Sequence, residues 1–254
     1  MLFVSFLCVI KNKKMNFRSC LILTLNFLFF FISCKEKMKT KKVIIAKKVE
    51  VVKEVVKVKP KQEKKLKSFN GINDSTFIRL IDFSKDFAYD MRYATKNNFL
   101  KEQVYECAEC YTRVNTAKAL IAVNNEFLKN GVKIKFFDCY RPNSVQYKMW
   151  KIKPNPQYVA NPKKGSVHNR GGAVDITLET VDGKELDMGT DFDFFGWKAY
   201  HDNYNLPDNV LKNRKLLKTT MEKHGFKSVR SEWWHYNLSS AYRYKVANFT
   251  WDCK

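Results

Sequence analysis

Two long segments of the chain place apolar residues at the spacing of an amphipathic helix. The first covers residues 115–130 and is followed by Gly131, and the second covers residues 207–224 and is followed by Gly225. Glycine readily adopts the left-handed conformation that commonly ends a helix, so each glycine marks a C-terminal boundary. The pattern predicts two helices, the first of about four turns.

Strand-like patterns lie between and after these helices. Residues 132–137 alternate between apolar and polar, residues 173–178 form a short apolar segment, and residues 227–238 are typical of a last strand or hairpin. Helices and strands do not alternate regularly along the chain. The order therefore predicts an α+β fold with a central antiparallel sheet flanked by helices, and not a doubly wound parallel sheet. Arg141 follows the end of the first strand.

The N-terminal region has the pattern of a targeting segment. Basic residues at 11–18 precede an apolar run at 21–32, which has about the length of a signal-peptide core and is short for a membrane span. The run ends at Cys34 and resembles a bacterial lipoprotein signal, in which this cysteine carries the lipid. Residues 1–34 are therefore expected to be a lipoprotein signal, with Met15 as an alternative start. An uncleaved membrane anchor is the other interpretation, and both place the protein in the cell envelope.

Residues 35–68 have the composition of a disordered tether. The segment from 34 to 67 contains fourteen lysines and four glutamates, with many valines and no glycine or aromatic residue. Such a sequence cannot bury enough apolar surface to offset the entropy cost of ordering. Its charge predicts contact with anionic lipid or wall polymer, and a solvated spacer without a partner is the alternative.

Composition limits what the remaining residues, 69–254, can form. The chain has 254 residues, of which 45% are hydrophobic and 15% aromatic, so collagen-like and globally disordered classes are excluded. The net charge of +22 falls to +8 when only residues from Ser68 onward are counted. No stripe of arginine and aromatic residues occurs there, and nucleic acid is not expected as a partner. One catalytic-sized domain is predicted.

Four cysteines remain after the targeting segment: Cys107, Cys110, Cys139 and Cys253. An even number of cysteines outside the cytoplasm favours disulfides, with three possible pairings, over free buried thiols. The spacing of Cys107 and Cys110 also fits half of a metal knuckle, but no second cysteine pair completes it.

Candidate catalytic residues fall in three places. His168 and Asp175 flank a Gly-Gly turn, and Glu232 and His235 lie three residues apart in a tryptophan-rich stretch. Two histidines and one aspartate are a suitable ligand set for zinc with a coordination position left for water, and Glu232 could take and return its proton. Arg141 could hold an oxyanion or a carboxylate by a two-pronged contact.

Each of these groups alone has an ordinary structural interpretation, such as a hydrogen-bonded loop or a turn anchored by arginine. Taken together they favour a zinc hydrolase, because two of only four histidines occur here and each has a carboxylate partner. His224 lies at a helix C-terminus, where a cation suits the helix dipole. His201 lies in a polar loop. Neither is expected at the site.

Five short motifs occur in the order seen in the D-alanyl-D-alanine dipeptidases, a family that includes the dipeptidase of vancomycin resistance. They are Asp90-Met91-Arg92-Tyr93-Ala94-Thr95, Asp138-Cys139-Tyr140-Arg141-Pro142, Ser166 to Asp175, Met188 to Phe194, and Glu232-Trp233-Trp234-His235. The resemblance covers about residues 70–245. It implies the small α+β zinc-peptidase fold shared with zinc D,D-carboxypeptidases and the hedgehog signalling domain.

The same resemblance implies a role for each candidate residue. His168, Asp175 and His235 would bind one zinc ion per chain, Glu232 would activate the zinc-bound water, and Arg141 would stabilise the tetrahedral intermediate. The implied reaction is hydrolysis of the dipeptide D-alanyl-D-alanine to two D-alanines, in cell-wall peptide turnover or salvage.

Ser166 and Asp193 would hold the free amino group of the substrate, again by resemblance. An acidic group there selects a free N-terminus and so separates a dipeptidase from an enzyme that trims longer wall peptides. Two alternatives stay open at this point: a zinc D,D-carboxypeptidase or endopeptidase acting on intact peptidoglycan peptides, and a zinc-retaining envelope binding protein without turnover. Glu232 argues against the last, because a binding protein needs no base at that position.

Overall fold

The computed structural model describes residues 65–253. Residues from Lys65 onward make one compact unit, and its described part contains its own hydrophobic core and two disulfides. The predicted signal segment with Cys34, and the predicted tether as far as residue 64, lie outside the described residues. Lys67, which lies within the predicted tether, belongs to this unit. Its ammonium lies 2.9 Å from the carboxylate of Asp82. Within the described part of the chain, no helix is both long and apolar enough to span a membrane.

The unit is built on a five-stranded sheet with the order β2-β4-β5-β7-β6. The edge strand β2 runs parallel to β4, and the other neighbours are antiparallel. The α+β class and the predominantly antiparallel sheet are thus confirmed, with one parallel pairing added at an edge. The strands are β2 (Ala88–Tyr89), β4 (Val132–Asp138), β5 (Ala173–Thr180), β6 (Phe226–Val229) and β7 (Glu232–Leu238). A separate antiparallel pair joins β1 (Phe77–Arg79) to β3 (Tyr111–Arg113).

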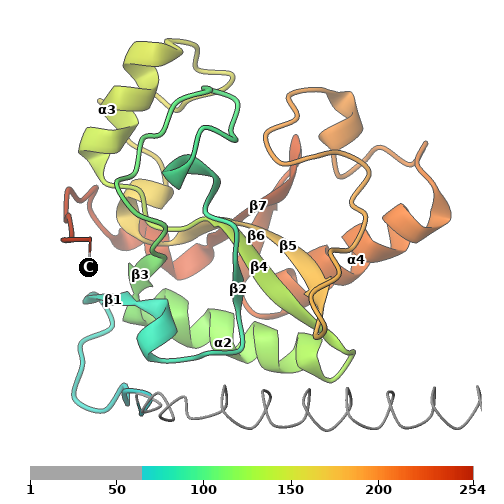
Figure 1. Ribbon diagram of the computed structural model, residues 1–254, viewed down its shortest axis with the longest axis horizontal. Coiled ribbons are helices and arrows are strands. Elements are labelled where there is room, and N and C mark those ends of the chain that lie inside the picture. The colour runs from blue at the N-terminus through green and yellow to red at the C-terminus, as the bar shows by residue number, and fades with distance from the viewer. Residues whose placement is uncertain (1–64, 254) are drawn as a thin grey trace, which may run out of the picture. The chain divides into compact units, whose positions relative to one another are not determined.

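Three α-helices accompany the sheet: α2 (Val114–Leu128), α3 (Asn143–Ile152) and α4 (Asp208–Lys223). Helices α2 and α4 pack on the sheet and on each other, whereas α3 lies with the long loops on the other side of the unit (Figure 1). Both predicted helices are confirmed to within two residues. Gly131 and Gly225 follow them with φ of +71° and +87°, the left-handed conformation that their positions require.

The core lies between the sheet and helices α2 and α4 and also extends to the other side of the sheet, where it includes Tyr93, Met149 and Phe192. Its largest fully buried side chains include Trp233 and Trp234 of β7, Tyr140, and Phe136 of β4. Burying an aromatic side chain of this size contributes about 2–3 kcal/mol relative to leaving it in water. The strands that carry the candidate site are therefore also the most firmly packed elements of the unit.

Helix α3 and the three shortest strands were not predicted from the pattern. Strands β1, β2 and β3 have two or three residues each, which is too short for a periodic signal. Helix α3 has apolar residues at helical spacing, Val145, Met149 and Ile152, but the segment spans only ten residues and only Gln146 and Met149 are fully buried, so its pattern is short. Tertiary contacts, and not local pattern, hold these elements in place.

The four cysteines form two disulfides, Cys107–Cys253 and Cys110–Cys139. The prediction of disulfides is confirmed, and the alternatives of free thiols and of half a metal knuckle are wrong for this structure. The second disulfide fastens the residue before β3 to the residue after β4. It therefore fixes the corner from which Arg141 projects.

Candidate active site

Strand register brings three of the chemically important side chains to one level of the sheet. Asp138 of β4 pairs with Asp175 of β5, and Asp175 pairs with His235 of β7. A shift of register between Phe136 and Asp138 produces the first of these pairings. Neighbouring strands lie about 5 Å apart, so side chains at one level and on one face are close enough to share a ligand.

Glu232 and His235 reach the same site only because β7 is irregular. Residues three apart on a regular strand point to opposite faces of the sheet. Along β6 and β7, Ser228 pairs with Tyr236, but the next residue, Val229, pairs with Glu232. The three extra residues of β7 form a bulge, which re-aims side chains in the way that bulges beside active sites commonly do.

His168, Asp175 and His235 offer ligand atoms that all lie within 4.8 Å of one another. His168 Nε2 lies 3.2 Å from His235 Nδ1 and 3.4 Å from an oxygen of Asp175. His235 Nδ1 lies 2.9 Å from the other oxygen of Asp175. The structure thus joins the three side chains that the sequence singled out as ligands, from β5, β7 and the short 3-10 helix at His168–Arg170.

The hydrogen bonds behind this cluster show that it suits a metal ion. The second nitrogen of His168, Nδ1, lies 2.7 Å from the carbonyl oxygen of Cys139, and the second nitrogen of His235, Nε2, lies 2.9 Å from the side-chain oxygen of Asn237. Both oxygens can accept a hydrogen bond, so with a cation in the site each far nitrogen would carry the proton and each near nitrogen would present a lone pair. Two lone pairs and a carboxylate would then converge on that cation. This donor set fits zinc.

Glu232 lies at the edge of this cluster. One oxygen of its carboxylate is 3.9 Å from His235 Nδ1, and 28% of the side chain is exposed. Because it is close to the ligand atoms and open to solvent, the carboxylate can exchange a proton with a water or an amine beside them. The role of Glu232 as a base stays a prediction.

Arg141 is buried against the opposite side of the site and is held by three groups. Its guanidinium donates to Asp138 through Nε (3.1 Å) and Nη2 (2.5 Å), and to Gln146 through Nη1 (3.0 Å). It also stacks over the ring of Tyr93, with 5.1 Å between the guanidinium carbon and the ring centroid. Although burial acts to lower it, the charge of Asp138 raises the pKa of Arg141 well above its usual value. Arg141 is therefore a fixed positive charge beside the cluster.

All five sequence motifs meet at this site. Arg92 of the first motif forms an ion pair with Asp191 of the fourth, and Tyr93 donates a hydrogen bond to Asp193. Trp233 of the last motif donates to Thr190. The second and third motifs meet where His168 Nδ1 bonds the carbonyl of Cys139.

Comparison with known proteins identifies the group to which this constellation belongs. A family model described as D-ala-D-ala dipeptidase, Peptidase_M15, matches residues 73–252. The chain belongs to this family of dipeptidases. It is therefore a peptidase, and the resemblance inferred from the five motifs is confirmed.

Relatives with the same description occur in distant bacteria. The D-alanyl-D-alanine dipeptidase of Escherichia coli is 32% identical over 168 residues, which cover 66% of this chain and 87% of that protein. The D-alanyl-D-alanine dipeptidase of Enterococcus faecalis is 30% identical over 186 residues. This match covers 65% of this chain and 92% of that protein. A solved structure described as VanYB in complex with D-alanine-D-alanine has 18% identity and a TM-score of 0.33, over 53% of this chain and 76% of that one.

The electrostatics of this dipeptidase site favour a cation between the ligands. Burial acts to raise the pKa of Asp175, but His168 and His235 lower it strongly, so the carboxylate stays ionised. Burial opposes a charge on His235, yet the hydrogen bond and the charge of Asp175 raise its pKa to about 9. A field that favours a proton on His235 equally favours a metal cation.

Asp193 lies within the electrostatic reach of the cluster, and its role toward substrate stays a prediction. Its carboxylate accepts a 2.9 Å hydrogen bond from Tyr93, and its backbone has φ of +57°. Burial, and next the charge of Asp175, raise the pKa of Asp193 well above its usual value. An incoming ammonium group would supply the positive charge that this carboxylate needs to ionise. The left-handed backbone of a non-glycine residue is a mild strain, of the kind that is often found at functional sites.

Ser166 is not brought into contact with the ligand cluster. Its hydroxyl accepts a long hydrogen bond from the backbone of Asn169, at 3.4 Å, and its own amide donates to the Asn169 side chain at 2.7 Å. Asn169 in turn donates to the carbonyl of Arg141. The contacts of Ser166 thus help to shape the loop that carries His168, and its role toward substrate stays a prediction.

Several groups that support the site were not singled out from the sequence. Asp138 is fully buried, binds Arg141, and also accepts a 2.7 Å hydrogen bond from Tyr105. Its position three residues before Arg141 is a usable signal, because oppositely charged residues so close in sequence often pair. The carbonyl of Cys139 and the side chain of Asn237 carry no such signal, since only the fold brings them to the imidazoles.

Proposed function

We propose that this chain hydrolyses the free dipeptide D-alanyl-D-alanine to two D-alanines, with one zinc ion bound by His168, Asp175 and His235. The observation that carries the proposal is the convergence of two imidazole lone pairs and a carboxylate, with Glu232 3.9 Å from one of the ligand nitrogens. Zinc at this position would polarise the scissile carbonyl and lower the pKa of the attacking water toward about 7.

Glu232 acts as the proton carrier in this proposal. Its carboxylate removes the proton of the attacking water and later delivers it to the amine of the leaving D-alanine. Burial, reinforced by the charge of Asp175 and opposed by that of His235, raises the pKa of Glu232. A raised pKa makes the carboxylate a stronger base than an ordinary glutamate and keeps its acid form available at higher pH, as the two steps require.

Arg141 and Asp193 bind two charged groups of the reacting dipeptide, the developing oxyanion and the ammonium group. The guanidinium of Arg141 is held in place by Asp138 and Gln146, so it offers a fixed positive charge to the oxygen that becomes negative during attack. Asp193 accepts the free ammonium group. Because a buried carboxylate binds an ammonium far better than a neutral amide does, this contact favours a substrate with a free N-terminus.

The test combines metal analysis with an alanine-release assay on the purified protein. We expect about one zinc per chain and release of alanine from D-alanyl-D-alanine, with much slower hydrolysis of the N-acetylated dipeptide and of longer wall peptides. Faster turnover of the longer peptides would instead identify a D,D-carboxypeptidase. Alanine release by a protein that lacks metal after chelation would contradict the zinc proposal.

We also propose that the protein is an exported lipoprotein, anchored through Cys34, with the lysine-rich segment in contact with anionic lipid or wall polymer. Support comes from the apolar run that ends at Cys34 and from the fourteen lysines that follow it between residues 34 and 67. Mass spectrometry of the mature N-terminus should find a lipid on Cys34, and Cys34→Ala should release the protein from the membrane fraction. An unmodified Cys34 in membrane-bound protein would contradict this.

In the envelope the proposed role is salvage of dipeptide released from the wall. A deletion strain supplied with D-alanyl-D-alanine as nutrient should grow more slowly than its parent. Equal growth of the two strains would remove the support for salvage.

A further inference from the structure

From Ser68 onward, the chain carries almost all of its net charge in one segment. Residues 141–174 contain seven lysines and arginines and no aspartate or glutamate, whereas the remainder of the chain from Ser68 contains 22 basic and 21 acidic residues. The segment includes α3 and the loop that follows it to His168. Since the rest of the chain from Ser68 is nearly neutral, this concentration points to a local electrostatic function and not to general solubility.

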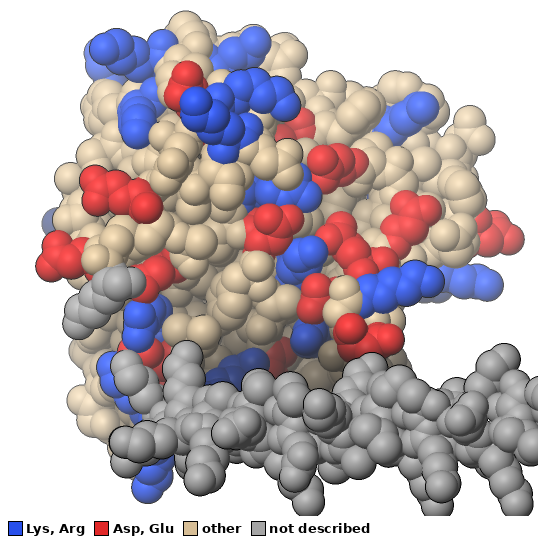
Figure 2. Space-filling view, in the orientation of Figure 1, with Lys and Arg blue, Asp and Glu red and all other residues tan. Residues whose placement is uncertain are grey.

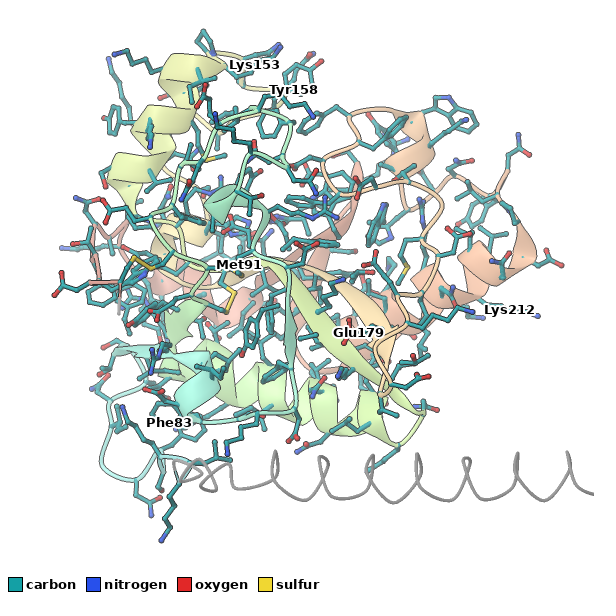
Figure 3. All side chains as sticks on the ribbon, in the orientation of Figure 1. Phe83, Met91, Lys153, Tyr158, Glu179 and Lys212 are labelled. Carbon is teal, nitrogen blue, oxygen red and sulfur yellow. A yellow bond between two sulfur atoms is a disulfide. The ribbon has the colours of Figure 1, made fainter. Side chains whose placement is uncertain are left out.

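Five lysines of this segment are exposed. Lys148 and Lys151 lie on α3, Lys153 follows the helix, and Lys163 and Lys164 lie in the loop. None of the five pairs with a carboxylate among residues 65–253; Lys148 donates to a backbone carbonyl, and Lys153 lies over the ring of Tyr158 (Figure 3). In Figure 2, basic side chains gather over this part of the unit. We call these five lysines, with the exposed face of α3, the α3 face.

The α3 face also exposes apolar side chains between its charges. Tyr147 is 49% exposed and Ile152 is 40% exposed. Tyr147, Lys148 and Lys151 occupy neighbouring positions on one side of the helix, because residues three and four apart share a face. The opposite side of α3, with Gln146 and Met149, is buried. A short helix with lysines around exposed tyrosine and isoleucine has the composition of a surface that lies on a bilayer.

We propose that the α3 face binds the surface of an anionic phospholipid bilayer. The lysines would lie among the lipid phosphates, and Tyr147 and Ile152 would enter the boundary between head groups and acyl chains. Charge complementarity favours an anionic partner, and the exposed apolar pair favours a bilayer over a soluble polyanion, which offers no apolar phase. The 30 residues between Cys34 and Lys65 extend to at most about 100 Å, so anchorage at Cys34 would allow this contact.

The contact would leave the catalytic groups accessible. Arg141 lies on the inner side of the segment, where it bonds the buried Gln146, and none of the five lysines touches His168, Asp175, His235 or Glu232. Binding at the α3 face should therefore change where the enzyme resides and not how it hydrolyses a soluble dipeptide.

Sedimentation with vesicles tests the proposal on the unit from Lys65 to Lys254, which keeps only Lys65 and Lys67 of the lysine-rich segment and has its own core and disulfides. The probes are vesicles of phosphatidylglycerol mixed with phosphatidylcholine, and vesicles of phosphatidylcholine alone. We expect binding to the anionic vesicles only, weakened by salt. Replacing all five lysines by glutamine should reduce the partition coefficient at least tenfold, since each lysine near an anionic surface contributes roughly a fivefold gain.

A matched control removes the same number of charges elsewhere. Its five lysines are exposed, lie without carboxylate partners among residues 65–253, and belong to other faces, as Lys212 does in Figure 3. The control variant should bind within twofold of the parent. An equal loss in both variants would overturn the proposal, because attraction would then follow net charge alone. The control positions are Lys129, Lys198, Lys212, Lys215 and Lys227.

The apolar pair gives a second, independent readout. Tyr147→Ser with Ile152→Ser should reduce binding several-fold even at high salt, where the lysine contribution is screened. Binding of the parent unit to a soluble polyphosphate but not to anionic vesicles would replace the bilayer by an anionic polymer and overturn the proposal. Alanine release and circular dichroism, unchanged in all variants, would show that each remains folded.

Discussion

The two halves of the site are built in different ways. The proposed metal-binding half rests mainly on the sheet, where Asp175 and His235 lie on adjacent strands in direct register, and His168 joins them from a 3-10 helix. The proposed substrate-binding half is carried by loops: Asp193 lies in the long segment after β5, and Tyr93 belongs to a single 3-10 turn. Strand register fixes the first half through backbone hydrogen bonds, whereas the second depends on a few side-chain contacts.

The two halves therefore differ in how much displacement of their side chains they can tolerate. A misplaced zinc ligand loses the ion, so its position must be held to a fraction of an ångström, and a sheet with a buried core provides that rigidity. A group that selects substrate can tolerate more variation, because a loop can change its length or sequence without disturbing the core. The ion pair of Arg92 with Asp191 and the hydrogen bond of Tyr93 to Asp193 hold the loop of this enzyme in place.

Glu232→Gln should have the largest effect, because it removes the proton carrier from the sheet-borne half and leaves the ligands in place. We expect kcat to fall by about 10²- to 10⁴-fold with unchanged zinc content. Steady-state kinetics and metal analysis measure both quantities, and Glu185→Gln, an exposed carboxylate paired with Lys135, is the matched control. Near-normal turnover would contradict the proposed role.

Removal of the disulfides should distinguish stability from activity. Cys107→Ser with Cys253→Ser opens a loop of 146 residues and should lower the free energy of unfolding by about 2–4 kcal/mol, with little change in turnover. Cys110→Ser with Cys139→Ser should cost similar stability and also reduce turnover at least tenfold, because the corner that carries the His168 partner and Arg141 is released. Denaturant titration and kinetics measure the two effects. Equal turnover in both variants would show that the corner needs no disulfide.

Asp193→Asn should affect the loop-borne half alone. We expect kcat/KM for D-alanyl-D-alanine to fall about tenfold to thirtyfold, through loss of one charged contact with the substrate ammonium. The N-acetylated dipeptide, which has no ammonium, should change less than threefold. A parallel loss for both substrates would mean that Asp193 supports the catalytic groups and does not select the substrate.

The smallest effect concerns His201, away from the site. Burial, and next the charge of Lys218, lower the pKa of His201 from 6.5 to about 4, and Nε2 is buried without a partner. The loop was predicted as polar, but it places this imidazole against Tyr236. On acidification the unfolded chain binds a proton first, so stability is lost as pH falls from about 6.5 to 4, by about 1–2 kcal/mol. Unfolding of His201→Asn should lack this component of the pH dependence.

Much of the fold and the site could be predicted because the signals are local. The helices at Val114–Leu128 and Asp208–Lys223 follow from the spacing of apolar residues, which each segment must bury. Both helices end near a glycine. The ligands His168, Asp175 and His235 were predicted from rare residue types beside carboxylates. By contrast, α3 and the two-residue strand β2 have too little pattern of their own. Their positions depend on neighbours that are distant in sequence.

The sequence alone pointed to the residues proposed to carry the chemistry, because the chain has only four histidines and two of them lie in short motifs that also hold a carboxylate. Only the tertiary structure decided how they face one another. The bulge in β7 turns Glu232 toward the side of the sheet that His235 occupies, and the fold brings the Cys139 carbonyl and Asn237 to the imidazoles. The physical reason is that a strand's alternation is a local property, whereas register, bulges and the proton on each histidine ring depend on partners supplied by the fold.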